Sequence, residues 1–419
     1  MPVREVLTAA NLSQKLLTAS ARSMVRLSPT DLARLVRYSE AFFRTAPRSA
    51  RQIARLTAPP GRRVLRNDFA ITYASLLSLN ALHVIFAAGD IRDAARVDPR
   101  IDRFYDTPAK RELAVWSRRY VNGMPKDLRL KIFEQKLLAQ RGYLKFEAAH
   151  PSYELVDVID LSSGRYTKQR SVYKLVFIDR RTGKEVVCLL KPPVKSQLES
   201  AAYKNEVFYS QYLKVFQPDP VEIHLYDDLS VIEFVDGMGS NRLLSGRRLN
   251  PEYAGLVDKL LTWFAQAAAL ADAVSKGDRD IGVEGGLWGN FILALDETGR
   301  RIVRIVSIDH EYVFNPEDRF AVESAEKGYL EMNFLASLPD FADAGQRQAL
   351  FERFSADYKD MYGRICQKQA EIEALIEGYY GKGEELAIFR SNLTRDPDAW
   401  LELLFGKVEL FWQKSQLLV

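Results

Sequence analysis

Residues 171–191, SVYKLVFIDRRTGKEVVCLLK, decide the fold of this chain. Two runs rich in β-branched and aromatic residues flank RRTG, a tetrapeptide with the polar and glycine residues that turns favour. The pattern predicts an antiparallel hairpin whose second strand ends at Lys191. Residues 152–161, just before it, have the same character and predict a third strand in the same sheet.

The runs that follow alternate between helix and strand patterns. Residues 196–216 have the apolar spacing of a helix, and residues 221–228 and 229–238 predict two more strands. A long helix is then predicted over residues 251–275, with Asn250 as its N-cap. The order is that of a sheet with one inserted helix, followed by helical structure.

The remaining sequence has mostly helical patterns, apart from a second predicted hairpin at residues 290–309. The chain has 419 residues, of which 47% are hydrophobic and 27% are charged, so it is long enough for several domains. We therefore expect an α+β protein in three parts. They are an all-helical N-terminal domain (1–150), a lobe built on antiparallel strands (151–240) and a mainly helical lobe (241–419).

Lys191 is the first candidate functional residue, because it ends a strand as apolar as VVCLL. An ammonium group in such a place either reaches water or meets a negative partner. In phosphoryl transfer from ATP, a strand lysine binds phosphates and pairs with a glutamate of a helix. We choose Glu206 of the predicted helix for this partner, while Glu199 lies on nearly the same helical face.

One polar loop and one connecting segment extend this candidate nucleotide site. The loop over residues 161–168, LSSGRYTK, contains Ser163 and Gly164, whose backbone N–H groups suit a phosphate. An ordinary hairpin loop is the alternative interpretation. The segment that begins at Glu233 would connect the two lobes, and we expect backbone groups of Glu233 and Val235 to bind an adenine ring.

Asn290 and Asp309 flank the second predicted hairpin, one at each of its open ends. Their side-chain oxygens would face one cavity about a strand spacing apart. Oxygen ligands of this kind suit Mg²⁺ that is bound to the β- and γ-phosphates of ATP. The glycine-rich loop before Asn290 contains three acidic candidates for the residue that orients the acceptor hydroxyl, Asp278, Asp280 and Glu284.

In this order, the candidate residues resemble those of the protein-kinase-like superfamily. The resemblance is closer to its atypical branch, which includes phosphatidylinositol 3/4-kinases, HipA-like kinases and bacterial effector kinases. Those families have a strand lysine, a helix glutamate, a Gly-Asp-Arg-His-x-x-Asn loop and an Ile-Asp-x-Gly or Phe-Asp-x-Gly motif. The matching residues here are Lys191, Glu206, Gly277-Asp278-Arg279, Asn290 and Ile308-Asp309. The resemblance covers about residues 152–400 and implies a bilobal fold that uses ATP and Mg²⁺.

The chain departs from the family pattern at three places, which leaves the catalytic base open. Asp280 stands where histidine is usual, and extra residues separate the Asp-Arg pair from Asn290. Asp309 is followed by His310 and a glutamate, without the family's glycine. By the resemblance, Asp278 matches the position of the base best and Asp280 is second.

The resemblance implies a kinase that transfers the γ-phosphate of ATP to a hydroxyl group. The acceptor would be a protein Ser or Thr, or a phosphoinositide head group, and small molecules such as antibiotics stay open. Two alternatives keep the fold but change the function. One is a nucleotide-binding pseudokinase that recruits a partner, and the other is a kinase-like enzyme that transfers AMP.

The first 70 residues carry thirteen Lys or Arg against four acidic residues, although the net charge of the whole chain is only +4. This basic region suits an anionic membrane surface or partner, and an ordinary solvated helix face is the alternative. A transit peptide at the N-terminus is a third interpretation. We expect no nucleic-acid partner, because few aromatic residues lie among the arginines.

A cytoplasmic location is expected, at a membrane surface if the basic region binds lipid. No secretory signal is visible, and Cys188 and Cys366 are predicted to be buried, reduced thiols. Residues 71–89 are uncharged and close to membrane-spanning length. They contain polar residues such as Asn80 and His83, so a buried helix is the better prediction.

Overall fold

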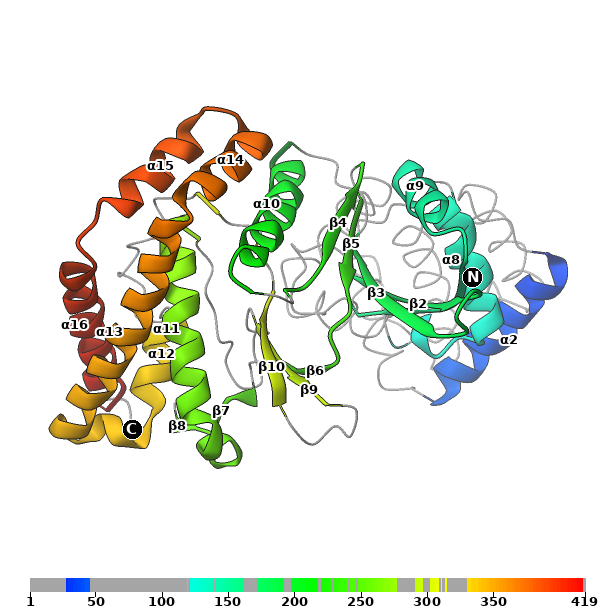
Figure 1. The fold of residues 1–419 in the computed structure, drawn as a ribbon. Coiled ribbons are helices and arrows are strands. Elements are labelled where there is room, and N and C mark those ends of the chain that lie inside the picture. The colour runs from blue at the N-terminus through cyan, green and yellow to red at the C-terminus, as the bar shows by residue number, and fades with distance from the viewer. Residues whose placement is uncertain are drawn as a thin grey trace, which may run out of the picture. The chain divides into compact units, whose positions relative to one another are not determined.

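The computed structural model contains helices and antiparallel sheets, so the chain is a mixed α and β protein (Figure 1). The described residues are 28–45, 119, 121–138, 140–161, 172–191, 197–217, 220–227, 229–239, 242–245, 248–276, 291–296, 302–308, 310, 313–314 and 330–416. Contacts divide the chain into two compact units. Unit 1 comprises residues 1–195 and 224–234, and unit 2 comprises residues 196–223 and 235–419.

Unit 1 is built on a five-stranded sheet with the order β1-β2-β3-β5-β4. The strands are β1 (Tyr153–Asp160), β2 (Tyr173–Asp179), β3 (Glu185–Lys191), β4 (Ile223–Tyr226) and β5 (Leu229–Glu233). The pairs β1–β2, β2–β3 and β3–β5 are antiparallel. Four of the five strands predicted for this part of the sequence are therefore confirmed, and so is the hairpin that ends at Lys191.

The turn between β2 and β3 is organised by Asp179. Its carboxylate accepts hydrogen bonds from Arg181 N at 3.0 Å and from the Thr182 hydroxyl at 2.9 Å. The bond from Arg181 N is the main reason why the pKa of Asp179 is lowered. Gly183 has a φ of +69°, which glycine adopts at little cost. The RRTG tetrapeptide therefore forms the predicted turn.

The helices of unit 1 are α2 (Pro29–Thr45), α8 (Lys126–Leu138) and α9 (Arg141–Ala149). Apolar residues of α8 and α9 pack on one face of the sheet and share a core with alternate strand residues such as Leu175 and Cys188. Gly142 permits close packing, because a Cβ atom there would lie 2.3 Å from the Tyr226 carbonyl oxygen. The helix α2 is tied to α8 by Lys131, whose ammonium lies 3.0 Å from Asp31.

His150 lies at the junction between α9 and β1. Its ring stacks on Tyr153 with centroids 4.8 Å apart, and its Nε2 atom lies 3.1 Å from the Tyr226 hydroxyl. Burial lowers the pKa of His150, and the nearby His224 lowers it further. The folded chain therefore takes up a proton at His150 less readily than the unfolded chain does. Its contribution to stability is present above the ordinary histidine pKa of about 6.5 and is lost as the pH falls.

We expect acid to destabilise the parent protein more than a His150→Phe variant. Phenylalanine keeps a ring against Tyr153 but cannot be protonated, so its contribution does not change with pH. Urea unfolding at about pH 7.5 and about pH 5.5 measures the free energy of unfolding of both proteins. An equal loss in the two proteins would contradict the assignment of this pH dependence to His150.

Unit 2 is mainly helical. Its α-helices are α10 (Gln197–Lys214), α11 (Val257–Ala273), α12 (Leu330–Ser337), α13 (Ala344–Gln367), α14 (Gln369–Tyr380), α15 (Glu384–Leu393) and α16 (Pro397–Gln416). Two short 3₁₀ helices are η2 (Pro251–Leu256) and η4 (Pro339–Ala342). The strands are β6 (Gly237–Gly239), β7 (Leu244–Ser245), β8 (Arg248–Leu249), β9 (Phe291–Leu295) and β10 (Ile302–Ser307).

The core of unit 2 lies around α11 (Figure 1). Phe264 of α11 stacks on Phe334 of α12, with centroids 4.4 Å apart, and meets Phe291 of β9 edge-on. The fully buried Phe208 and Tyr212 bring α10 into the same core. The sequence predicted α10 within the 151–240 lobe, whereas contacts group it with the helices of unit 2. The three-part domain division stays a prediction.

The run predicted as one strand over residues 229–238 is two strands. The first, β5, ends at Glu233, and β6 begins at Gly237 in a separate sheet with the order β10-β9-β6. A Cβ atom at Gly237 would lie 2.4 Å from the Leu293 carbonyl oxygen, so the close approach to β9 requires glycine. The hairpin predicted over residues 290–309 is confirmed as β9 and β10.

The helix predicted over residues 251–275 begins as the 3₁₀ helix η2 and becomes α-helical only at Val257. The Asn250 side chain accepts a hydrogen bond from Glu252 N at 3.2 Å, which confirms its predicted capping role. Proline follows Asn250 at the first helical position, where its missing N–H is tolerated.

The two cysteines differ. Cys188 is buried in β3, and burial raises the pKa of its thiol to about 12. Cys366 is exposed on α13, so the prediction that both are buried is wrong for Cys366. In the part of the chain that the structure describes, no helix combines the length and apolarity needed to span a membrane. Residues 71–89, predicted as a buried helix, lie outside that part.

Candidate functional site

Lys191 lies on the second face of the sheet in unit 1. It is half-buried at the end of β3, directly opposite Ser230 of β5, and Leu189 is opposite Ile232. Side chains alternate along a strand, so Leu189 and Lys191 share one face. Cys188 lies on the other face, in the core with α8 and α9. Lys191 therefore projects from the face that α8 and α9 leave free.

The register places a mainly apolar patch beside Lys191 on the second face. Besides Lys191 and Ser230, the face carries Lys174, Val176, Val187, Leu189 and Ile232, side by side on β2, β3 and β5. None of these seven belongs to the core that α8 and α9 form. Lys174 is directly opposite Leu189. An apolar surface with cations beside it can accept a flat aromatic ring that carries an anionic group.

Glu233 and Val235 lie where the chain leaves this sheet. Glu233 is the last residue of β5, and Val235 is buried. Between them, Phe234 N donates to Val187 O at 3.3 Å, and the Phe234 ring centroid lies 4.0 Å from the Lys174 ammonium. The boundary between the two units falls between residues 234 and 235. The segment predicted to connect two lobes does link two compact units.

Glu206 lies on α10 in unit 2 and is only 1% exposed. A carboxylate so deeply buried is costly unless hydrogen bonds or an opposite charge compensate it. Such burial is typical of a residue with a specific partner. Lys191 belongs to unit 1 and Glu206 to unit 2, so the predicted ion pair between them stays a prediction.

Seven candidate site residues lie outside the described part of the chain. They are Ser163, Gly164, Asp278, Asp280, Glu284, Asn290 and Asp309. The structure nevertheless describes the ends of the segments that contain them. At the base of the first segment, Leu161 N donates to Val172 O at 2.9 Å. The predicted phosphate loop therefore starts and ends at one pair of antiparallel strands, β1 and β2.

Residues next to the two predicted metal ligands, Asn290 and Asp309, pair with each other in the hairpin of β9 and β10. Phe291 of β9 is directly opposite Ser307 of β10. Asn290 comes just before Phe291, and Asp309 follows Ser307 by two positions. The ends of β9 and β10 that lead to these two residues are therefore adjacent.

A backbone hydrogen bond joins the end of α11 to the segment that follows β10. Phe314 N donates to Val274 O at 2.8 Å. Ser275 and Phe314 themselves have φ values of 49° and 56°, a conformation that costs energy in residues other than glycine. Strained backbone of this kind gathers at functional sites, where the surrounding structure must hold it in place.

The ring of Tyr209 on α10 lies close to two titratable side chains that were not among the predicted site residues. His310 is 1% exposed, and its ring centroid lies 4.3 Å from that of Tyr209. Lys276 is 5% exposed, and its ammonium lies 5.8 Å from the same ring centroid. Lys276 stands two positions before Asp278, and His310 directly follows Asp309. Their nearness to candidate residues was the only signal in the sequence.

A network of buried hydrogen bonds also joins the end of α11 to helices α13, α15 and α16. Asn392 of α15 is 3% exposed and donates to the carbonyls of Asp272 (3.1 Å) and the next residue (2.8 Å). It also donates to the Ser275 hydroxyl at 3.1 Å. The Asp272 carboxylate accepts from the Tyr358 hydroxyl at 2.9 Å and from Trp400 Nε1 at 2.8 Å. The residues just before the glycine-rich loop are thus fixed.

No protein-family model matches this chain, and a search of curated proteins finds no match either. The residues and their geometry therefore carry the functional conclusion. Within the described residues, no group of three or more His, Cys, Asp or Glu side chains is arranged to hold a metal ion. Both predicted metal ligands, Asn290 and Asp309, lie outside those residues.

Proposed function

We propose that this chain is an Mg²⁺/ATP-dependent phosphotransferase with a bilobal protein-kinase-like fold. The observation that carries the proposal is the place of Lys191. It ends the third strand of a sheet ordered β1-β2-β3-β5-β4, and α10 follows before β4. Protein kinases carry their phosphate-binding lysine on the third strand and its glutamate partner on the helix that follows. Lys191 and Glu206 have these two positions along the chain.

The second face of the sheet supports a site for ATP. An adenine ring would pack on Val187, Leu189 and Ile232, while backbone groups of Glu233 and Val235 would bind its polar edge. Lys191 would then neutralise charge on the phosphates, because its strand ends beside this apolar patch. Ser163 and Gly164 would bind the phosphates from the loop between β1 and β2.

Asn290 and Asp309 would hold the metal ion in this proposal. Mg²⁺ supplies neutralisation of the charge on the β- and γ-phosphates. The paired neighbours Phe291 and Ser307 support a common site for the two oxygen ligands. Asp278 or Asp280 would orient the acceptor hydroxyl, from the loop that follows Lys276.

The acceptor in the proposal is a protein Ser or Thr, or a phosphoinositide head group. The exposed or half-exposed arginines Arg34 and Arg37 lie on α2, in the basic N-terminal region. Arg34 is already paired with Asp127, at 2.5 Å, so it adds less positive charge to this helix surface than Arg37 does.

Incubation of the protein with ATP and Mg²⁺, followed by intact-mass spectrometry, tests the function. The proposal expects addition of a phosphoryl group to the chain or to an added protein or lipid acceptor. Addition of AMP would instead identify an AMP transferase. Nucleotide binding without any transfer, measured by calorimetry, would identify a pseudokinase. If the protein neither binds ATP nor transfers any part of it, the proposed site is contradicted.

A further inference from the structure

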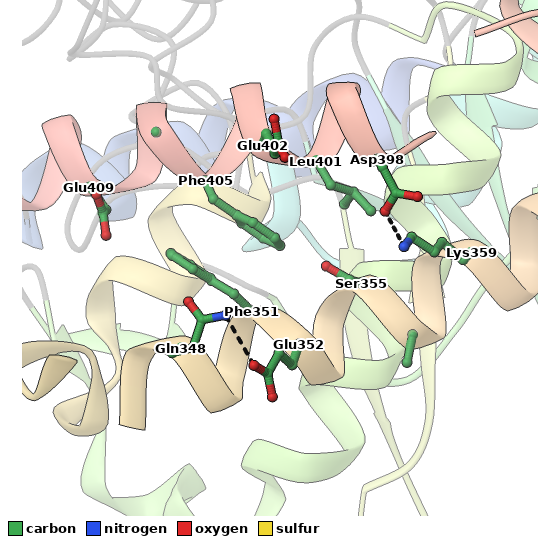
Figure 2. A pocket seen from close by; sticks show the side chains of 12 residues that line it. Gln348, Phe351, Glu352, Ser355, Lys359, Asp398, Leu401, Glu402, Phe405 and Glu409 are labelled. Carbon is green, nitrogen blue, oxygen red and sulfur yellow. Dashed lines mark hydrogen bonds and ion pairs between the residues drawn. The ribbon is translucent and has the colours of Figure 1, made fainter. Parts of the chain in front are cut away.

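The helices α13 and α16 of unit 2 are separated by a groove with a volume of about 810 Å³ (Figure 2). The two helices run antiparallel, because Arg347 pairs with Glu409 at one end and Lys359 pairs with Asp398 at the other. Figure 2 shows the Lys359–Asp398 pair closing that end of the groove. The groove is independent of the residues proposed to bind ATP.

The floor of the groove is aromatic. Phe351 of α13 and Phe405 of α16 stack with centroids 4.0 Å apart and ring planes within 10° (Figure 2). Small residues keep the space above them open, namely Ser355 and Ala356 on α13 and Gly406 on α16. A Cβ atom at Gly406 would meet nothing within 4 Å. The helices therefore leave apolar surface and free volume between them.

The two edges of the groove have the spacing of a helix-packing seam. On α13 the lining residues Gln348, Glu352, Ser355 and Lys359 follow one another at steps of four, three and four positions. On α16 the lining residues Asp398, Glu402, Phe405 and Glu409 repeat the same steps. Steps of three and four line one face of a helix and are the spacing at which a further helix packs. An edge of this length spans about 17 Å, or about three helical turns.

The acidic residues along the groove indicate which kind of partner it binds. Four of the described residues that line it are acidic, and two of these are already in ion pairs, Asp398 with Lys359 and Glu409 with Arg347. Among the described residues, neither Glu352 nor Glu402 has a basic partner, and both are exposed. Glu352 accepts a hydrogen bond from the Gln348 side chain at 3.1 Å and keeps its charge. The two carboxylates, one on each edge and neither in an ion pair, attract a cationic partner and disfavour an acidic one.

We propose that this groove binds a basic amphipathic helix of a partner protein. Small or apolar side chains of that helix would lie over Phe351 and Phe405, as in other helix-in-groove complexes. Arginine or lysine residues on its two flanks would reach Glu352 and Glu402. The site gives the chain a means to recruit a protein partner, whatever reaction it catalyses.

The probe for this site is a synthetic helix-forming peptide of about 15 residues, labelled with a fluorophore. It carries arginines on both flanks of a leucine stripe, and a matched peptide carries glutamates in place of the arginines. We expect saturable binding of the arginine peptide in fluorescence anisotropy. Neutralising two charges with Glu352→Gln and Glu402→Gln should weaken its affinity roughly fivefold to tenfold.

Two further variants separate a loss of the site from a loss of fold. Asp340→Asn with Asp360→Asn removes two exposed charges outside the groove and should leave the affinity unchanged. Gly406→Leu fills the groove at a position with free space, so it should abolish binding without lowering the unfolding temperature.

Three results would overturn the proposal. They are no saturable binding of the arginine peptide, equal binding of the glutamate peptide, and unchanged affinity in the Glu352/Glu402 double variant. Sedimentation of the parent as a dimer that this double variant dissociates would overturn it too, because the occupant would then be a second copy. Each of these results leaves the proposed phosphotransfer untouched, since the peptide assay contains no ATP.

Discussion

Replacement of Lys191 by methionine is expected to reduce ATP-dependent transfer by about 10²–10³-fold, the range found when one charge-stabilising donor is removed from an active site. Methionine keeps the unbranched apolar stem at the end of β3 but removes the ammonium. The proposed function gives that ammonium the task of neutralising phosphate charge. Rates of phosphoryl incorporation, measured by mass spectrometry for parent and variant, give the effect directly.

Lys184→Met provides the matched control for this variant. Lys184 is exposed in the turn that precedes β3, so it lies at the opposite end of the same strand. Its replacement removes the same charge from the same unit and should leave the rate unchanged. If the Lys191→Met variant transfers phosphate at the parental rate, Lys191 is not part of the site.

The second large effect is expected at Asn392. An Asn392→Leu variant would remove the buried side-chain donor from two carbonyl groups and one hydroxyl at the end of α11. Among the described residues, only the Asp272 carbonyl of these groups keeps a backbone donor, Ser275 N at 3.3 Å. Each buried group left without its hydrogen bond costs about 1–3 kcal/mol. We expect the free energy of unfolding to fall by about 3–5 kcal/mol, at the high end for single substitutions. Urea unfolding measures the difference.

The neighbouring Ser391 supplies the comparison. It is exposed, and its replacement by alanine should change the free energy of unfolding by no more than about 0.5 kcal/mol. If Asn392→Leu unfolds at the same urea concentration as Ser391→Ala, the network does not hold the end of α11. A large destabilisation confined to Asn392→Leu would support the network as the anchor of the segment before the glycine-rich loop.

Local sequence patterns predicted the strands of unit 1 well. Alternating apolar residues and the RRTG turn act over a few positions, so β2 and β3 could be predicted without their surroundings. The same patterns missed the break between β5 and β6. Glycine at position 237 was visible, but its reason, the carbonyl of Leu293, lies more than fifty positions away.

The tertiary contacts within unit 2 could not be predicted from periodicity. Asn392 and Asp272 lie 120 positions apart, and Tyr209 and His310 come from different elements. Packing of this kind depends on tertiary contacts that no single segment contains. The position of Lys191 at the end of β3 was predictable for the opposite reason, because one charge at the end of an apolar strand stands out locally.

The most direct test of the central claim is acylation by an acyl-phosphate derivative of ATP, which transfers its acyl group to lysines beside the bound phosphates. Peptide mass spectrometry in the presence of Mg²⁺ identifies the modified residue. The account predicts modification of Lys191, prevented by excess unmodified ATP, with Lys184 unaffected. Modification of Lys191 that is no greater than that of Lys184, or that excess ATP does not prevent, would contradict it.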